Sequence, residues 1–259
     1  MVNDNDGLIL RIERTSIHDG QGLRVVIFMK GCPLSCKWCS TPESQNDFVE
    51  RGYGRVISVD QAVEEICKDE IFFFHSDGGV TVSGGECLLQ PNFVAGVLKE
   101  CRQRGINTAV ETSLFAPWQS VQKILPFLNS IYVDLKHSES RMHKKLVGVD
   151  NSLILTNLKK LDQSCLPFGI HLRIPLIPGM NDADDVLLKT LSIAASIKKL
   201  KEVEILPYHR LGVGTYAKLG RLYELEDVVT PSREYIIERV EFLRNQGLNV
   251  PVKAGGGYL

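Results

Sequence analysis

The stretch LRVVIFMKGCPLSCKWCS, residues 23–40, joins a β-branched run to three closely spaced cysteines. Residues 23–29 are typical of a buried strand, and Cys32, Cys36 and Cys39 follow it in one loop, residues 31–41. Three neighbouring thiols could serve as metal ligands, as redox partners or as small apolar side chains at a bend. The surrounding sequence must decide between these interpretations.

The C-x3-C-x2-C spacing points to a metal centre with an open position. Structural zinc sites take four ligands, commonly from two separated C-x2-C pairs, whereas this loop supplies three. Zinc completed by a distant Cys or His remains an alternative. Thiolates also suit iron-sulfur clusters, which normally take four of them. Three thiolates on a cubane would leave one iron open to a substrate or cofactor.

The rest of the chain alternates short β-branched runs with longer helical patterns, which is typical of β-α units around a parallel sheet. The predicted strands are residues 23–29, 79–83, 107–112, 130–135, 169–175 and 202–207. The predicted helices are residues 58–69, 90–105, 116–128, 152–163, 182–200 and 232–247. The sequence therefore predicts an α/β fold in a single domain, residues 1–259, with a flexible tail from about 254 to 259.

Composition excludes several partners. Thirty basic residues balance thirty-one acidic ones without a long run of either sign, so nothing predicts binding to nucleic acid or to an anionic membrane. The N-terminus lacks the features of a signal peptide, and no apolar run is long enough to span a membrane. An odd count of seven cysteines favours free thiols or metal ligands in the reducing cytoplasm. Cys67, Cys87, Cys101 and Cys165 are interpreted as small apolar residues.

Unusual polar residues and glycines follow the predicted strands, where parallel β-α folds build their sites. Most also have a purely structural explanation. Gly84 and Gly85 could form a tight turn, with the next glutamate as an acid in the first turn of a helix. Asp134 and Lys136 could be a surface ion pair, Arg173 a snorkelling arginine and His209 a hydrogen-bonded loop histidine. Together with the three cysteines they occur at the same ends of six strands, which favours a shared site. These residues are Gly84, Gly85, Glu111, Thr112, Asp134, Lys136, Arg173 and His209.

Six segments in order resemble the glycyl radical enzyme activating enzymes of the radical S-adenosylmethionine (SAM) superfamily, of which the activator of pyruvate formate-lyase is the best known. They are IHDGQGLRVVIFMKGCPLSCKWCSTPESQ (17–45), VTVSGGECLLQ (80–90), VDLKH (133–137), LVGV (146–149), RIPLIPGMND (173–182) and ILPYHRLG (205–212). The resemblance implies a radical SAM core, a partial (β/α)6 TIM-type barrel.

The resemblance also implies the cofactors. Cys32, Cys36 and Cys39 would bind three irons of one [4Fe-4S] cluster, and SAM would bind the fourth iron. Residues implied to line the SAM site are Trp38, Ser40, Gly84, Gly85, Asp134, Leu135, Lys136, Arg173 and His209. A monovalent cation near the SAM carboxylate would take Glu111, Thr112, Asp134 and the carbonyl of Tyr132 as ligands.

The implied function is an oxygen-sensitive activation reaction. Reductive cleavage of SAM would give a 5'-deoxyadenosyl radical that removes hydrogen from a glycine of a partner glycyl radical enzyme, with flavodoxin or ferredoxin as electron donor. Two alternatives remain: a radical SAM enzyme acting on a small molecule or peptide, and a non-catalytic metal-binding or electron-transfer protein.

The sequence departs from the usual pattern of these enzymes in three places. Residues 40–66 contain no cysteine, so we expect no ferredoxin-like insertion and only one cluster. Ser40 and Thr41 replace a usual His-Asn pair, and Gln21 replaces a usual proline. The change at Ser40 and Thr41 affects contacts near SAM. The change at Gln21 affects the loop that meets the partner's glycine.

Overall fold

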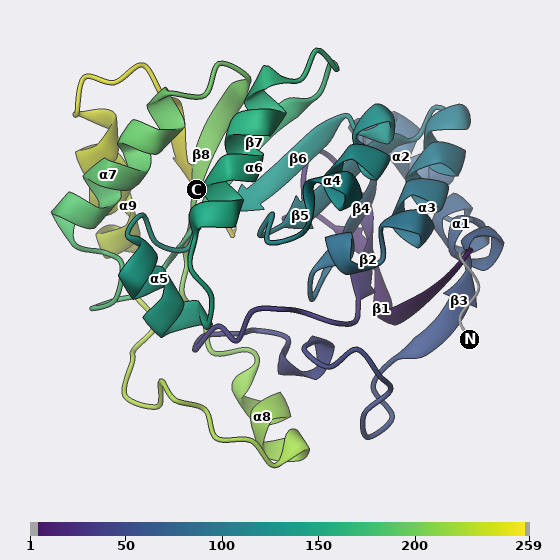
Figure 1. Cartoon of the computed structure of the whole chain (residues 1–259), viewed down its shortest axis with the longest axis horizontal. Helices are drawn as coiled ribbons and strands as arrows, with labels where there is room; N and C mark the ends of the chain where they lie inside the picture. Colours follow the sequence, from purple (N-terminus) through teal and green to yellow (C-terminus); the bar gives the residue numbers. More distant parts are fainter. Residues whose placement is uncertain (1–4, 257–259) are drawn as a thin grey trace. The chain divides into compact units, whose positions relative to one another are not determined.

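The computed structural model describes residues 5–256, which form an α/β protein (Figure 1). The chain divides into two compact units, described one at a time. The first unit holds residues 5–33, 43–131 and 165–168, and the second holds residues 34–42, 132–164 and 169–256. The prediction of a single domain stays a prediction.

The first unit is built on strands in the order β3-β1-β2-β4-β5. Strand β1 is antiparallel to β2 and β3, whereas β2, β4 and β5 run parallel. Val25, Val26 and Ile27 of β2 are fully buried, which explains the continuous apolar run in the sequence. The strands are β1 (Asp6–Ser16), β2 (Arg24–Met29), β3 (Arg55–Ser58), β4 (Gly79–Gly84) and β5 (Asn107–Thr112).

Helices of the first unit follow its strands. Ser58 caps α1 by accepting a hydrogen bond from the Gln61 backbone, as the start of the predicted helix at residue 58 implies. The α-helices are α1 (Val59–Cys67), α2 (Glu70–Ser76), α3 (Pro91–Gln103) and α4 (Trp118–Ile124). Short 3-10 turns are η1 (Pro42–Ser44), η2 (Cys87–Leu89) and η3 (Leu125–Phe127), of which η1 begins in the second unit.

The second unit contains the parallel strands β7, β8 and β9, in that order. Strand β6 (Ser130–Asp134) begins in the first unit and has its last three residues in the second. The other strands are β7 (Gly169–Leu176), β8 (Leu200–Pro207) and β9 (Val252–Ala254). The helices are α5 (Ser140–Val147), α6 (Ser152–Gln163), α7 (Asp184–Ala195), α8 (Val213–Leu219) and α9 (Arg233–Arg244).

All six predicted strands are present, as β2, β4, β5, β6, β7 and β8, and the α/β class is confirmed. Within residues 5–256 the structure adds β1, β3 and β9 and the helices α2, α5 and α8. The helix predicted over residues 182–200 ends earlier, at Ala195, and Leu200 already begins β8. No helix of the described chain has the length and apolar character needed to cross a membrane.

The tail predicted from residue 254 is partly regular structure. Ala254 is the last residue of β9 and pairs with Ile205, and the Gly255 N–H donates to the Ile205 carbonyl. The flexible-tail prediction is therefore wrong for Ala254 and Gly255, because both belong to the edge formed beside β8. Residues 257–259 lie outside the described part of the chain.

Candidate functional site

In the first unit, the start of the cysteine loop is fixed by its backbone. Immediately after β2, the Gly31 N–H donates to the Ser44 carbonyl at 2.7 Å and the Cys32 N–H donates to the Gln45 carbonyl at 2.9 Å. Gly31 has φ of +94°, a conformation that favours glycine. The sequence GC after the strand therefore turns the chain and places Cys32 on a backbone held at two points.

Gly84 and Gly85 end β4 against the same turn. A Cβ on Gly84 would lie 2.1 Å from the Met29 nitrogen, and one on Gly85 would lie 2.2 Å from the Gly31 carbonyl oxygen. The Gly85 N–H donates to the Met29 carbonyl, at 3.0 Å. Close backbone packing is thus sufficient to require both glycines. Their predicted contact with SAM is a separate matter and stays a prediction.

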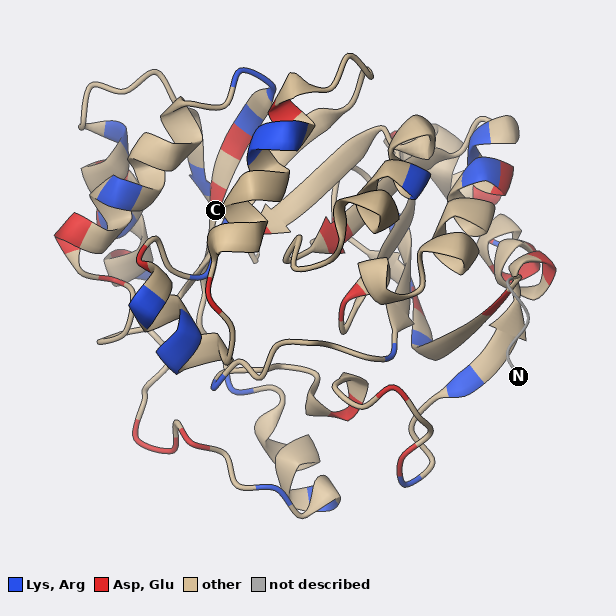
Figure 2. Ribbon diagram, in the orientation of Figure 1, with Lys and Arg blue, Asp and Glu red and all other residues tan. Residues whose placement is uncertain are grey.

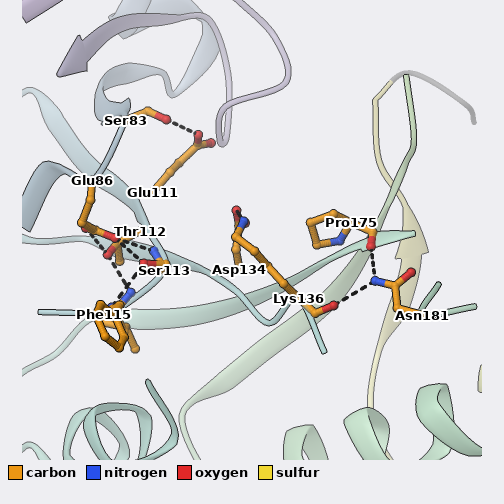
Figure 3. A network of polar contacts seen from close by, with 11 residues as sticks. Ser83, Glu86, Glu111, Thr112, Ser113, Phe115, Asp134, Lys136, Pro175 and Asn181 are labelled. Atoms are coloured by element: carbon orange, nitrogen blue, oxygen red, sulfur yellow. Dashed lines mark hydrogen bonds and ion pairs between the residues drawn. The ribbon is translucent and has the colours of Figure 1, made fainter. Parts of the chain in front are cut away.

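Glu86, which follows these glycines, has hydrogen-bond partners that its sequence pattern did not predict. Its side chain is 1% exposed, and it caps η2 by accepting from the Leu88 N–H at 3.1 Å. The same carboxylate accepts from the Thr112 hydroxyl at 2.6 Å and from the Ser113 N–H at 2.9 Å (Figure 3). Glu86 therefore joins the ends of β4 and β5, a role that its place in SGGE could have suggested but not specified.

Two of the four predicted cation ligands lie at the end of β5. The Glu111 carboxylate accepts from the Ser83 hydroxyl at 2.7 Å (Figure 3). The Thr112 hydroxyl donates to Glu86 and accepts from the Leu114 N–H at 2.9 Å. The other two predicted ligands, Tyr132 and Asp134, belong to the second unit.

In the second unit, the cysteine loop is bonded to the C-terminal end of α5. The Ser35 N–H donates to the Val147 carbonyl at 2.9 Å, and the Lys37 N–H donates to the Leu146 carbonyl at 3.1 Å. These carbonyls belong to the last turn of α5, whose C=O groups lack partners within a helix. Gly148 ends the helix with φ of +88°. The LVGV segment is thus the backbone support of the loop.

Cys36 and Cys39 form one turn of this loop, with the Cys39 N–H donating to the Cys36 carbonyl at 3.1 Å. Burial raises the pKa of the Cys36 thiol to about 12, against an opposing effect of the Lys136 ammonium. The free thiol is therefore protonated at neutral pH, and a bound metal would displace that proton. The two thiols have the spacing and the chemistry of soft metal ligands.

The segment around α8 also packs against this part of the loop. A Cβ on Gly212 would lie 2.8 Å from the carbonyl oxygens of Cys39 and Ser40, so the HRLG segment closely approaches the loop. The Arg221 guanidinium donates to the Pro42 carbonyl at 2.7 Å. Trp38 is 8% exposed, which fits a covering role, whereas Ser40 is exposed.

The end of β6 places the charged pair predicted from VDLK. The Lys136 ammonium donates to the Asp134 carboxylate at 2.8 Å, and Leu135 between them is fully buried. Asn181, another missed residue, donates from one amide nitrogen to the carbonyls of Lys136 and Pro175, at 2.9 and 2.6 Å (Figure 3). Asn181 is 1% exposed and fixes the backbone at Lys136.

Arg173 and Tyr132 form a buried group with Glu204. The Arg173 Nε donates to the Glu204 carboxylate at 2.8 Å, and its guanidinium lies 4.4 Å from the centre of the Tyr132 ring. A buried arginine needs such a carboxylate, since an unpaired buried charge is costly.

His209 follows β8, and its exposed side chain accepts from the Leu211 N–H at 3.4 Å.

The structure thus brings Asp134 to Lys136 and Arg173 to Tyr132, and places Cys36 beside Cys39 in the second unit. Cys32, Gly84, Gly85, Glu111 and Thr112 lie in the first unit. Among residues 5–256, no three His, Cys, Asp or Glu side chains are arranged to hold a metal ion. The donor chemistry, three soft thiols in one loop, fits an iron-sulfur cluster, and the individual ligand roles stay predictions.

Comparisons with known proteins identify the family. The model of the Radical SAM superfamily matches residues 26–191. The chain is 34% identical to a (2S)-3-sulfopropanediol dehydratase activating enzyme of Klebsiella oxytoca, over 95% of this chain and 96% of the relative. It is 32% identical to a choline trimethylamine-lyase activating enzyme of Oleidesulfovibrio alaskensis, over 92% and 94% of the two chains.

A solved structure agrees. A domain of pyruvate-formate lyase-activating enzyme from Bacteroides vulgatus matches with a TM-score of 0.56 and 32% identity, covering 69% of this chain and 99% of that one. The predicted α/β radical SAM fold is confirmed, and with it the requirement of such enzymes for a [4Fe-4S] cluster and SAM. The activating-enzyme interpretation is supported over the small-molecule and electron-transfer alternatives. This chain belongs to the radical SAM superfamily and, within it, to the glycyl radical enzyme activating enzymes.

Proposed function

We propose that this enzyme activates a partner glycyl radical enzyme with one cluster held by Cys32, Cys36 and Cys39. The observation that carries the proposal is the backbone support of the cysteine loop. Main-chain bonds hold Gly31 and Cys32 in the first unit, and others hold Ser35 and Lys37 in the second. All of these bonds are made by main-chain atoms, so binding of the thiolates to iron would break none of them.

When bound, the cluster and SAM supply the radical chemistry that removes hydrogen from the partner's glycine. Lys136 is suited to the SAM carboxylate, because its ammonium lies at the end of β6 and Asn181 fixes its backbone. Asp134 holds this ammonium at 2.8 Å and is suited to a ribose hydroxyl as well. Leu135, buried between them, keeps this turn rigid.

Arg173 acts through its neighbours as well as on SAM. Its Nε is committed to Glu204, and its guanidinium plane covers Tyr132. We propose that Arg173 helps to hold the SAM carboxylate while its buried pair with Glu204 fixes β7 against β8. Trp38, Ser40, Gly84, Gly85 and His209 complete the proposed SAM contacts.

A monovalent cation would bind at Glu111, Thr112, Asp134 and the carbonyl of Tyr132. Oxygen ligands of this kind suit hard cations. Thr112 would contribute a hydroxyl whose orientation is already set by Glu86 and Leu114. The Glu111 carboxylate would contribute an oxygen while keeping its bond from Ser83.

We also propose a single cluster, with flavodoxin or ferredoxin as the electron donor, in the cytoplasm. The alignment with the Klebsiella relative runs over 313 positions, more than the 259 residues of this chain, so the relative has segments without a counterpart here. This difference, together with the lack of cysteine in residues 40–66, supports the absence of a ferredoxin-like insertion.

The test is anaerobic reconstitution with iron and sulfide, followed by a SAM-cleavage assay. We expect 5'-deoxyadenosine with dithionite, and a glycyl radical by electron paramagnetic resonance when candidate partner enzymes are added. Cys36→Ala should lose both signals, whereas Cys165→Ala, at an exposed thiol outside the loop, should keep them. A reconstituted wild-type protein that binds iron but cleaves no SAM would contradict the proposal.

A further inference from the structure

We infer that the basic face of α5 docks an acidic one-electron carrier protein that reduces the enzyme. The basic face is defined by Arg141, Lys144 and Lys145. This inference rests on the proposed function, because only an enzyme that needs an electron from outside requires such a partner. It specifies where the electron carrier binds and which charged residues recognise it.

The basic face carries three exposed cations and no acid. Arg141, Lys144 and Lys145 are all exposed, and α5 contains no Asp or Glu, in keeping with the blue positions on this helix in Figure 2. None of the three forms an ion pair with a carboxylate of residues 5–256. Three cations and no acid within eight residues give the local surface a positive potential.

The acids that flank α5 form their direct contacts with residues outside this helix. The carboxylate of Glu139, just before the helix, is paired with Lys189. Asp150, just after it, accepts a hydrogen bond from the Ser152 N–H at 2.9 Å, and the charge of Lys144 also contributes to lowering the pKa of this carboxyl. Neither carboxylate neutralises the basic face by direct contact.

Helix stability does not account for this set of charges. Lys144 and Lys145 lie in the last turn, where cations interact favourably with the helix dipole. Arg141 lies in the first turn, where a cation is unfavourable by the same argument. In addition, the last carbonyls of α5 already accept bonds from the cysteine loop. Arg141 in particular requires another explanation.

The basic face belongs to the helix that supports the cysteine loop. The carbonyls of Leu146 and Val147 accept from Lys37 and Ser35, the residues on either side of Cys36. A carrier bound on α5 would therefore lie next to one of the proposed cluster ligands. Short separation is what electron transfer requires of such a complex.

The lack of an exposed large apolar side chain on α5 indicates a transient partner. Among residues 5–256, none of the exposed large hydrophobic side chains belongs to α5. Transient redox complexes are small and driven by charge complementarity, whereas lasting interfaces have an apolar centre. This chemistry favours an acidic electron carrier over the glycyl radical enzyme as the occupant.

The test compares two triple charge reversals of equal net change. The first is Arg141→Glu with Lys144→Glu and Lys145→Glu. The control is Lys159→Glu with Lys198→Glu and Arg233→Glu, which are exposed residues of the second unit outside α5. SAM cleavage is measured for each with dithionite, and separately with a reduced acidic flavodoxin as the probe, at low and high salt.

We expect the α5 variant to keep its dithionite rate within about twofold and to lose roughly tenfold or more of its flavodoxin-driven rate at low salt, with the salt dependence reduced. The control should match the wild type in both arms. Equal flavodoxin rates in the α5 variant and the wild type would overturn the inference, as would equal losses in both variants. A loss of partner-glycine activation alone would assign α5 to the glycyl radical enzyme instead. Failure of the wild type with dithionite would contradict the proposed function itself.

Discussion

Replacing Gly85 by alanine should displace the backbone that carries Cys32. A Cβ at Gly85 would lie 2.2 Å from the Gly31 carbonyl oxygen, 2.8 Å from its carbon and 3.0 Å from the Ser44 oxygen. Since ordinary van der Waals contact begins at 3.4 Å, the Gly31 carbonyl must shift by roughly 1 Å. The clash involves main-chain atoms, so rotation of a side chain cannot relieve it.

The cost has two parts. The Gly31 carbonyl accepts from the Glu86 N–H at 2.8 Å, and losing a buried hydrogen bond costs about 1–3 kcal/mol. Crowding in a close-packed region costs a further ~1–3 kcal/mol. Because both effects arise from one displacement, they overlap, and we expect a loss of about 2–4 kcal/mol in the free energy of unfolding. Gly85 does not have a positive φ, so backbone strain adds nothing.

The assay is urea unfolding of the cluster-free protein with a reductant, together with iron content after anaerobic reconstitution. Gly85→Ala should unfold at lower urea and bind less iron, because the residue before Cys32 is displaced. Gly214→Ala is the matched control: no heavy atom lies within 4 Å of its added Cβ. Alanine within α8 should leave stability unchanged or raise it by up to about 1 kcal/mol.

Unfolding within about 0.5 kcal/mol of wild type, with full iron content, would refute the steric argument for Gly85. If such a variant lost only SAM affinity, the alternative that its glycine makes room for the ligand would hold instead. The two explanations therefore predict changes in different measurements. The steric explanation predicts lower stability and iron content, whereas the ligand explanation predicts a loss of SAM affinity alone.

Three further predictions concern single side chains. Cys36→Ala should abolish the visible absorbance of the cluster while leaving urea unfolding of the cluster-free protein within about 1 kcal/mol of wild type, because the loop is held by main-chain bonds; a large loss of stability would contradict this. Glu86→Gln should cost roughly 2–3 kcal/mol, since in either orientation the amide nitrogen would face a backbone donor, the Leu88 N–H or the Ser113 N–H, and unchanged urea unfolding would show that these bonds carry little energy. Glu202 has its pKa lowered from the usual 4.5 to about 2, first by the His171 hydrogen bond and then by Lys253. Its carboxylate therefore stabilises the fold fully above the unfolded-state pKa, by about 3 kcal/mol at most, and this stabilisation falls to about 1 kcal/mol by pH 3. The difference in unfolding free energy between wild type and Glu202→Gln should shrink between pH 5 and pH 3, and a constant difference would show that the His171 contact is weak.

Local sequence patterns were sufficient for the central strands. β2 and β4 consist mostly of apolar or β-branched residues, and such runs predict buried parallel strands without knowledge of their neighbours. Strand β1 was missed because its eleven residues mix Arg and Glu with apolar residues, and its pairing with β2 is antiparallel. Strand β9 has only three residues and exists through its pairing with β8.

The site residues divide in the same way. Cys36 is recognisable from its spacing to the other two cysteines of the loop. Asp134 and Lys136 are recognisable from their spacing to each other. Glu86 and Asn181 were missed because their partners lie 26 to 45 residues away in the sequence. Contacts of that range depend on how the strands are placed, which no local pattern encodes. Arg173 was noticed, but its partner Glu204 lies on the neighbouring strand, 31 residues later.

Folding and cluster assembly use different atoms of the cysteine loop. Main-chain N–H groups of Gly31, Cys32, Ser35 and Lys37 bind carbonyls of their own units, and the thiols contribute to none of these bonds. A loop whose backbone is already held loses little further conformational freedom when iron binds. Besides Ser44 and Gln45, the support comes from two segments, LVGV and SGGE. In LVGV a helix end offers carbonyls without partners, and in SGGE adjacent glycines let the Glu86 N–H reach the Gly31 carbonyl. Substitutions in these two segments should therefore alter iron content without touching a single iron ligand.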